Sequence, residues 1–147
     1  MPIANAIRFS KLIIDASVTV KWFSIEEHTQ GARFIAEQAQ TGKVLLFAPE
    51  LLLYEVVNAL WKGKKFEHAR LAAALDLLLE SGVELLKLDR QLGLEAIRFM
   101  ISYDLTFYDA TYAGLASLMN IPLITTDAKL KAKAKEIEVL TLKDLKL

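Results

Sequence analysis

The stretch Leu12-Ile13-Ile14-Asp15 is a short apolar run that ends on an acidic residue. Two of its apolar residues are β-branched, which favours a buried strand with Asp15 at its carboxyl end. A second run of this kind, residues 121–126, leads into Asp127 and has its proline near the start, where a missing N–H does least damage. In an open parallel sheet, ligands bind beyond the carboxyl ends of the strands, so both acids are expected at that edge.

Helical and strand-like patterns alternate along the rest of the chain. Helices are expected over residues 26–40, from Pro49 to the polar segment at Lys62, over residues 67–79, 90–101 and 107–119, and after Asp127. Further strands are expected over residues 44–48, 83–88 and 139–141. This alternation predicts an α/β fold, a three-layer α/β/α sandwich with a central parallel sheet.

The bulk properties indicate a single domain over residues 1–147. A chain of this length with 54% hydrophobic residues has enough apolar material for one buried core. Residues 1–10 precede the first strand, and we expect a flexible extension there. The longest apolar stretch near the N-terminus is interrupted by Asp15 and Lys21 and is too short to cross a bilayer. We therefore expect a cytoplasmic protein without membrane contact.

Charge and cysteine content restrict the choice of ligand. The 18 basic and 18 acidic residues give a formal net charge of zero, so a nucleic-acid ligand would need a local basic patch. The chain has no cysteine, which excludes disulfides and thiolate metal sites. A bound metal ion would have to be held by oxygen atoms or by the two histidines.

Two further acids, Glu55 and Asp109, lie on apolar faces of the expected helices. An ionised carboxylate is costly to bury unless it is paired or bound to a cation. Asn58 lies one turn after Glu55 and is placed to orient it. Simpler explanations remain open for Glu55: its face is partly solvated, or a lysine pairs with it. For Asp109 the simpler explanation is the helix dipole, but its stabilisation of about 0.3–1 kcal/mol is too small to offset burial without another charge.

Convergence on one divalent cation would explain all four acids together. Asp15, Glu55, Asp109 and Asp127 come from separate segments, and Mg²⁺ or Mn²⁺ prefers carboxylate and water oxygens. Such a site could activate a water and stabilise the leaving oxygen in the hydrolysis of a phosphodiester. Asp127 alone is explained equally well as the N-cap of the helix that follows it.

The segments that carry these acids resemble the PIN domain family in its short VapC-type toxin form. The motifs stand in family order over nearly the whole chain, and together they are more specific than any one of them. The matching stretches are Leu12-Ile13-Ile14-Asp15-Ala16-Ser17, Glu55-Val56-Val57-Asn58-Ala59-Leu60, Tyr108-Asp109-Ala110-Thr111-Tyr112 and Thr125-Thr126-Asp127.

This resemblance implies a Mg²⁺- or Mn²⁺-dependent endoribonuclease, the toxin of a toxin–antitoxin pair. It implies metal ligands at the four acids, with Ser17 and Thr125 as supporting residues. It also implies an RNA substrate, a homodimer and a small antitoxin protein that inserts part of its chain near the acidic pocket. The leucine-rich helix over residues 71–79 is apolar on more than one side, which fits a homodimer interface or an antitoxin-binding groove.

Other residues are assigned less directly. Asp104 stands five residues before Asp109 and is either a helix-terminal residue or part of an outer shell around the metal. Tyr112 falls in an apolar stripe and is expected in the core or at a dimer interface. A candidate RNA-binding patch lies between two expected helices, although a solvated turn explains it as well. That patch is formed by Lys62, Lys64, Lys65 and Arg70.

Three other functions compete with a toxin nuclease. The domain could be an inactive RNA- or protein-binding module in which the acids no longer bind metal. It could be a ribonuclease of RNA processing rather than a toxin. A phosphoacceptor receiver domain is disfavoured, because such a site needs an adjacent acidic pair to hold its metal, and no such pair precedes a strand-end acid in the chain.

Overall fold

The computed structural model describes residues 9–145 and contains one five-stranded, all-parallel sheet with the order β3-β2-β1-β4-β5. β1 (Lys11–Ile14) lies at the centre, between β2 (Leu45–Pro49) and β4 (Leu123–Thr125). β3 (Glu84–Leu86) and β5 (Val139–Thr141) form the two edges. The predicted α/β class and the parallel sheet are confirmed.

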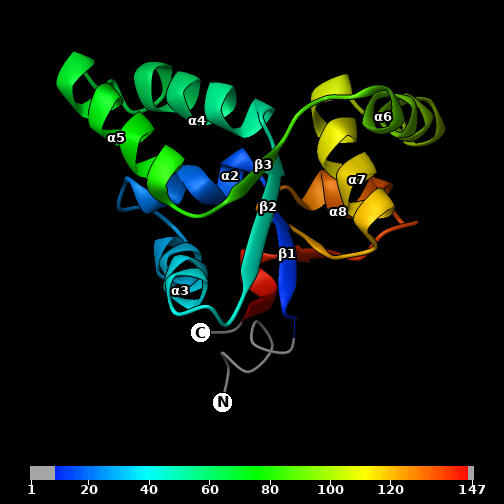
Figure 1. Cartoon of the computed structure of the whole chain (residues 1–147), viewed down its shortest axis with the longest axis horizontal. Helices are drawn as coiled ribbons and strands as arrows, with labels where there is room; N and C mark the ends of the chain where they lie inside the picture. Colours follow the sequence, from blue (N-terminus) through cyan, green and yellow to red (C-terminus); the bar gives the residue numbers. More distant parts are fainter. Residues whose placement is uncertain (1–8, 146–147) are drawn as a thin grey trace.

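Helices flank this sheet (Figure 1). Figure 1 shows α3, α4 and α5 on one side of the strands and α6, α7 and α8 on the other, with the short α2 directly after β1. The helices are α2 (Ala16–Thr19), α3 (Thr29–Gln40), α4 (Leu51–Lys62), α5 (His68–Glu80), α6 (Arg90–Tyr103), α7 (Phe107–Met119) and α8 (Ala128–Lys133). Two 3₁₀ turns, η1 (Val20–Trp22) and η2 (Leu142–Leu145), complete the described elements.

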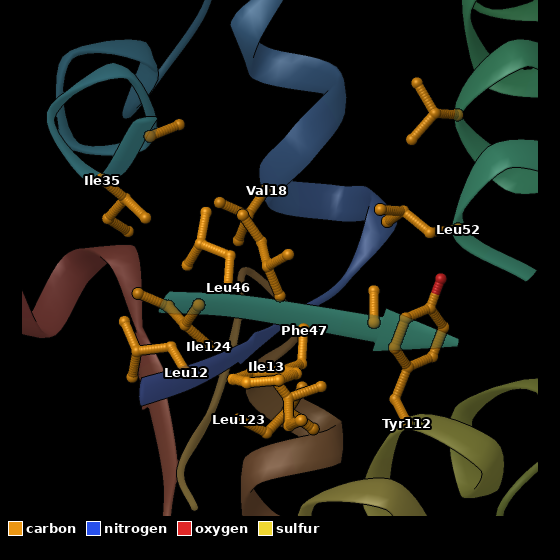
Figure 2. Close-up of a cluster of buried hydrophobic side chains, with 14 of the residues drawn as sticks. Leu12, Ile13, Val18, Ile35, Leu46, Phe47, Leu52, Tyr112, Leu123 and Ile124 are labelled. Carbon is orange, nitrogen blue, oxygen red and sulfur yellow. The ribbon is translucent and has the colours of Figure 1, made fainter. Parts of the chain in front are cut away.

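The core surrounds the central strand. Leu12, Ile13 and Ile14 are all buried, as expected for a strand that is covered on both of its faces. Figure 2 shows their neighbours from the helices, including Val18, and the ring of Tyr112 beside the end of β2. Because the core encloses β1, the residue that follows the strand is held in a fixed position.

Some expected boundaries differ from the structure. Pro49 ends β2 instead of starting a helix, because pairing with β3 continues to the next residue, where the Glu50 N–H donates to the Leu86 carbonyl at 3.0 Å. Helix α3 begins at Thr29, three residues later than expected, after His28 has adopted a left-handed backbone with φ of 64°.

Two further expectations concern the start of the chain and the membrane. Most of the expected flexible extension over residues 1–10 lies outside the described residues. Within residues 9–145, no helix is long and apolar enough to span a membrane.

Candidate functional site

Asp15 is the buried acid at the carboxyl end of the central strand. It is the N-cap of α2, with extended backbone angles, and is only 8% exposed. Its Oδ1 accepts hydrogen bonds from the Ser17 hydroxyl at 2.6 Å and from the Val18 N–H at 3.2 Å. Its Oδ2 accepts from the Thr125 hydroxyl. Both carboxylate oxygens are therefore fixed in direction.

Two hydroxyl groups link the ends of β1 and β4. The Thr125 hydroxyl, which donates to Asp15, also accepts the Asp127 N–H at 3.0 Å. The Ser17 hydroxyl likewise accepts the Thr126 N–H at 2.9 Å, and the two hydroxyl oxygens lie 3.3 Å apart. Ser17 and Thr125 thus lie directly beside Asp15, between it and the segment that carries Asp127.

Glu55 lies on α4 and is held by a tyrosine. Its side chain is partly buried, and its Oε1 accepts a hydrogen bond from the Tyr112 hydroxyl at 2.7 Å. Asn58, the residue expected to orient it, is instead exposed and lines an apolar groove on α4 and α5. The side chain that positions Glu55 therefore comes from α7.

Asp109 and Asp127 each lie near a helix N-terminus. Asp109 is in the first turn of α7, whose N-cap Thr106 accepts the Asp109 N–H at 3.1 Å. Asp127 is the N-cap of α8, and its Oδ1 accepts the N–H groups of Lys129 at 2.8 Å and Leu130 at 3.2 Å. Asp127 therefore does cap a helix, and this role engages one of its carboxylate oxygens.

Electrostatic repulsion couples the acids to one another. Burial raises the pKa of Asp15 to about 6, and the nearby charge of Glu55 contributes to the increase. Burial also raises the pKa of Glu55, and the charge of Asp109 adds to it. For Asp109, burial is again the main cause of a raised pKa, with a further contribution from Asp127. The four acids therefore form a continuous series of repelling neighbours.

Positive charge is scarce beside this series. Among the described residues, no lysine or arginine forms an ion pair with Asp15, Glu55 or Asp109. The charge of Lys133 acts on Asp109 without forming an ion pair and partly offsets the rise in the pKa of Asp109. The Lys133 Nζ donates to the carbonyl of Asp104 at 2.9 Å and lies 3.9 Å from the carboxylate of that residue.

The donor set fits a hard divalent cation, although the acids do not surround a single point. Oxygen ligands, burial and repulsion between neighbouring carboxylates all favour binding of Mg²⁺ or Mn²⁺. Within residues 9–145, however, no group of three acidic or histidine side chains is arranged to hold a metal ion. At least one of these side chains would have to move inward to complete a site.

Asp104 and the expected basic patch have other surroundings. Asp104 ends α6 with a left-handed backbone, φ of 53°, and its side chain is fully exposed. In the patch, Lys64 forms an ion pair with Glu26, and the Arg70 guanidinium lies 3.6 Å from the centre of the Phe66 ring. The remaining two members, Lys62 and Lys65, are exposed. Two of the four basic side chains of this patch, Lys64 and Arg70, are thus in contact with other residues of the protein.

The sequence does not predict the roles of the Tyr112 hydroxyl and the Lys133 amine beside the acids. The expected core position of Tyr112 is correct for its ring, and the residue is only 2% exposed. The available signal is its position one turn after Asp109 on α7. A buried phenol usually finds a partner for its O–H, so a nearby acceptor can be anticipated. Lys133 is one of several lysines on α8, and no sequence pattern separates it from the others.

Comparison with known proteins agrees with this fold. The PIN domain model matches residues 12–136. The chain is 31% identical over 134 residues to Ribonuclease VapC3 of Pyrobaculum aerophilum, an alignment that covers 84% of this chain and 94% of that protein. It is 40% identical over 95 residues to Exonuclease VapC9 of the same organism, covering 63% of this chain and 70% of that protein.

A solved structure extends the likeness to three dimensions. A chain of a toxin–antitoxin complex from Klebsiella pneumoniae superposes with a TM-score of 0.63 at 18% sequence identity, covering 89% of this chain and 97% of that one. The family match spans all four acids and most of the sheet that carries them. The chain therefore belongs to the PIN domain family, and its relatives include VapC-type nucleases.

Proposed function

We propose that this protein is a ribonuclease that cuts internal phosphodiester bonds of RNA and requires Mg²⁺ or Mn²⁺. The observation that carries the proposal is the buried carboxylate of Asp15. It lies at the end of the central strand, is repelled by Glu55, and has no ion-pair partner among residues 9–145. A buried charge of this kind is costly unless a cation neutralises it.

Asp15, Glu55, Asp109 and Asp127 would hold the cation. When bound, the cation lowers the pKa of a water molecule and offsets the charge that develops on the phosphate. Asp15 provides the fixed point of the site, because Ser17 and Thr125 orient both of its oxygens. Asp109 is only partly buried, and no ion pair in the described part of the chain fixes its carboxylate, so it can turn toward a ligand.

The distinction between internal and terminal cleavage needs a direct test, since the relatives include a named ribonuclease and a named exonuclease. A closed circular RNA has no ends, so only an endonuclease can open it. We expect the wild-type protein to linearise such a circle with Mn²⁺ and to leave it intact with EDTA. Asp109→Asn should leave the circle closed, and Asp104→Asn, a change at a fully exposed acid, should cut like the wild type.

Each result of this assay is informative. Degradation of linear RNA without opening of the circle would assign an exonuclease. A Mn²⁺-independent cut, or wild-type activity of the Asp109→Asn protein, would contradict the metal assignment. If neither RNA is cut and calorimetry detects no saturable Mn²⁺ binding, the chain is a binding module that has lost its catalytic function.

We further propose that the protein acts in the cytoplasm as the toxin of a toxin–antitoxin pair. A groove of about 540 Å³ on α4 and α5 would receive an apolar segment of the antitoxin. It is lined by Leu53, Tyr54, Val57, Asn58, Trp61, Leu71 and Leu75. Expression should arrest growth, and co-expression of a short neighbouring gene product should relieve the arrest. Leu75→Glu should prevent this relief without affecting RNA cleavage.

A homodimer is proposed through a different surface. Leu94, Ile97 and Ile101 follow one another at helical spacing along α6, and all three are exposed. A row of this kind is suited to pack against its copy in a second chain. Light scattering should give the mass of a dimer for the wild type and of a monomer for Ile101→Glu, whereas Leu75→Glu should remain dimeric.

A further inference from the structure

The Tyr112 hydroxyl occupies one of the two oxygens of Glu55. It donates to Oε1 at 2.7 Å, and among residues 9–145 no donor is bonded to Oε2. The tyrosine ring is anchored in the core, and Figure 2 shows it rising from α7 beside the end of β2. The two oxygens of this carboxylate are therefore not equivalent.

Simple physical reasons make this contact persistent. A phenol with an ordinary pKa of about 10 carries its proton at neutral pH and can donate one hydrogen bond. Because Tyr112 is buried, its hydroxyl has little access to water and would lose its acceptor if it left Glu55. Close packing of the core around the ring also opposes any reorientation.

The number of free carboxylate oxygens matters for the choice of cation. Mg²⁺ demands near-ideal octahedral geometry and Mn²⁺ suits similar oxygen ligands, whereas the larger Ca²⁺ readily accepts both oxygens of one carboxylate. A carboxylate oxygen that accepts a hydrogen bond keeps a lone pair and can still bind a metal ion, as proposed for Asp15, but it is a weaker ligand than a free oxygen. Glu55 should therefore bind a cation preferentially through Oε2 alone. The environment of Glu55 thus suits the smaller ions.

We propose that Tyr112 is a positioning residue that restricts Glu55 to a single free oxygen and thereby sets a preference for Mg²⁺ or Mn²⁺ over Ca²⁺. The inference rests on the proposed function, because it requires that Glu55 faces a divalent cation. It adds a determinant of metal selectivity that lies outside the four acids.

The test compares two tyrosines of α7. Tyr112→Phe keeps the buried ring and removes only its hydroxyl, and Tyr108→Phe makes the same change at an exposed position of the same helix. Titration calorimetry at pH 8 gives the Kd of each protein for Mn²⁺ and for Ca²⁺. Melting temperatures check that both variants are folded before metal is added.

We expect Tyr112→Phe to weaken Mn²⁺ binding by about 10-fold, the lower end of the range for the loss of a partner of a metal ligand. Its Kd for Ca²⁺ should stay within about 3-fold of wild type or fall, because the freed oxygen adds a ligand for the larger ion. Tyr108→Phe should leave both values unchanged.

A purely structural role of Tyr112 predicts a different pattern, in which both ions are weakened by the same factor. That result, or unchanged binding of both ions by Tyr112→Phe, would overturn the inference. The proposed function would still stand in either case, provided that the wild-type protein binds Mn²⁺. If the wild-type protein itself bound no Mn²⁺, the proposed function would fail and the inference with it. Failure at the two levels is therefore distinguishable.

Discussion

The buried carboxylate of Asp15 should make the metal-free protein less stable as the pH rises. Its pKa is 3.8 in its ordinary environment and about 6 in the folded protein, so folding favours the protonated form. At about 1.4 kcal/mol per pH unit, this difference is worth about 3 kcal/mol of the free energy of unfolding. Below pH 3.8 the group is protonated in both states, and above about pH 6 it is ionised in both. The loss of stability therefore falls between these two values.

The variant Asp15→Asn removes the titrating group and keeps a side chain of the same size. The free energy of unfolding of Asp15→Asn minus that of the wild type should increase by up to about 3 kcal/mol as the pH rises through this window. Urea unfolding in EDTA at each pH measures this difference. Acids with lowered pKa values, such as Glu26 and Glu136, cancel in the comparison because both proteins contain them.

Two controls sharpen this experiment. Asp104→Asn makes the same chemical change at a fully exposed acid and controls for the effect of the substitution itself on urea unfolding. Mn²⁺ at about 100 times its Kd should stabilise the wild type by about 2.7 kcal/mol and Asp15→Asn by much less. A pH-independent difference between Asp15→Asn and the wild type would refute the reasoning, because it would mean that the Asp15 carboxylate is not destabilised by burial.

Two further predictions concern the rim of the site and the packing behind it. Lys133 is close enough to Asp109 for its charge to act on that carboxylate, so we expect it to contact RNA phosphate at the site. Lys133→Ala should therefore weaken RNA binding and reduce the slope of log K against log salt by about 0.7, the value for one lost phosphate contact on a single strand, while Lys135→Ala serves as the control. Fluorescence anisotropy in EDTA measures both. Gly114→Ala should destabilise the fold by about 1–3 kcal/mol, because a Cβ there would lie 3.0 Å from the backbone N of Ala96. Gly93→Ala, with its nearest contact at 3.8 Å, should instead be neutral or stabilising in thermal unfolding.

The elements that could be predicted from the sequence are those with strong local signals. The helix over residues 107–119 and the strand over residues 139–141 have the expected limits, because helical periodicity and a β-branched run mark them. The expected helix start at Pro49 is wrong: proline favours the first turn of a helix, but Pro49 is the last residue of β2 and pairs with Leu86. The pairing with β3 decides between them, and that partner lies far along the chain.

Part of the candidate site could likewise be predicted from local sequence signals, and part could not. The positions of Asp15 and Asp127 follow from the rule for parallel sheets, since their strands β1 and β4 are neighbours. The contact between Glu55 and Tyr112 joins residues 57 positions apart and depends on how α7 and α4 are placed by the sheet. The local pattern indicates that a buried tyrosine hydroxyl needs an acceptor, but it does not identify Glu55 as that acceptor.

The hydroxyl link between β1 and β4 provides a reporter that needs no RNA. The N–H groups of Thr126 and Asp127 donate to the hydroxyls of Ser17 and Thr125 rather than to a strand partner. Their exchange with deuterium therefore follows the opening of the site itself and is separate from the unfolding of the sheet. A ligand that tightens Asp15 should slow these two amides selectively, so NMR can detect occupancy of the site even in a variant that has lost catalysis.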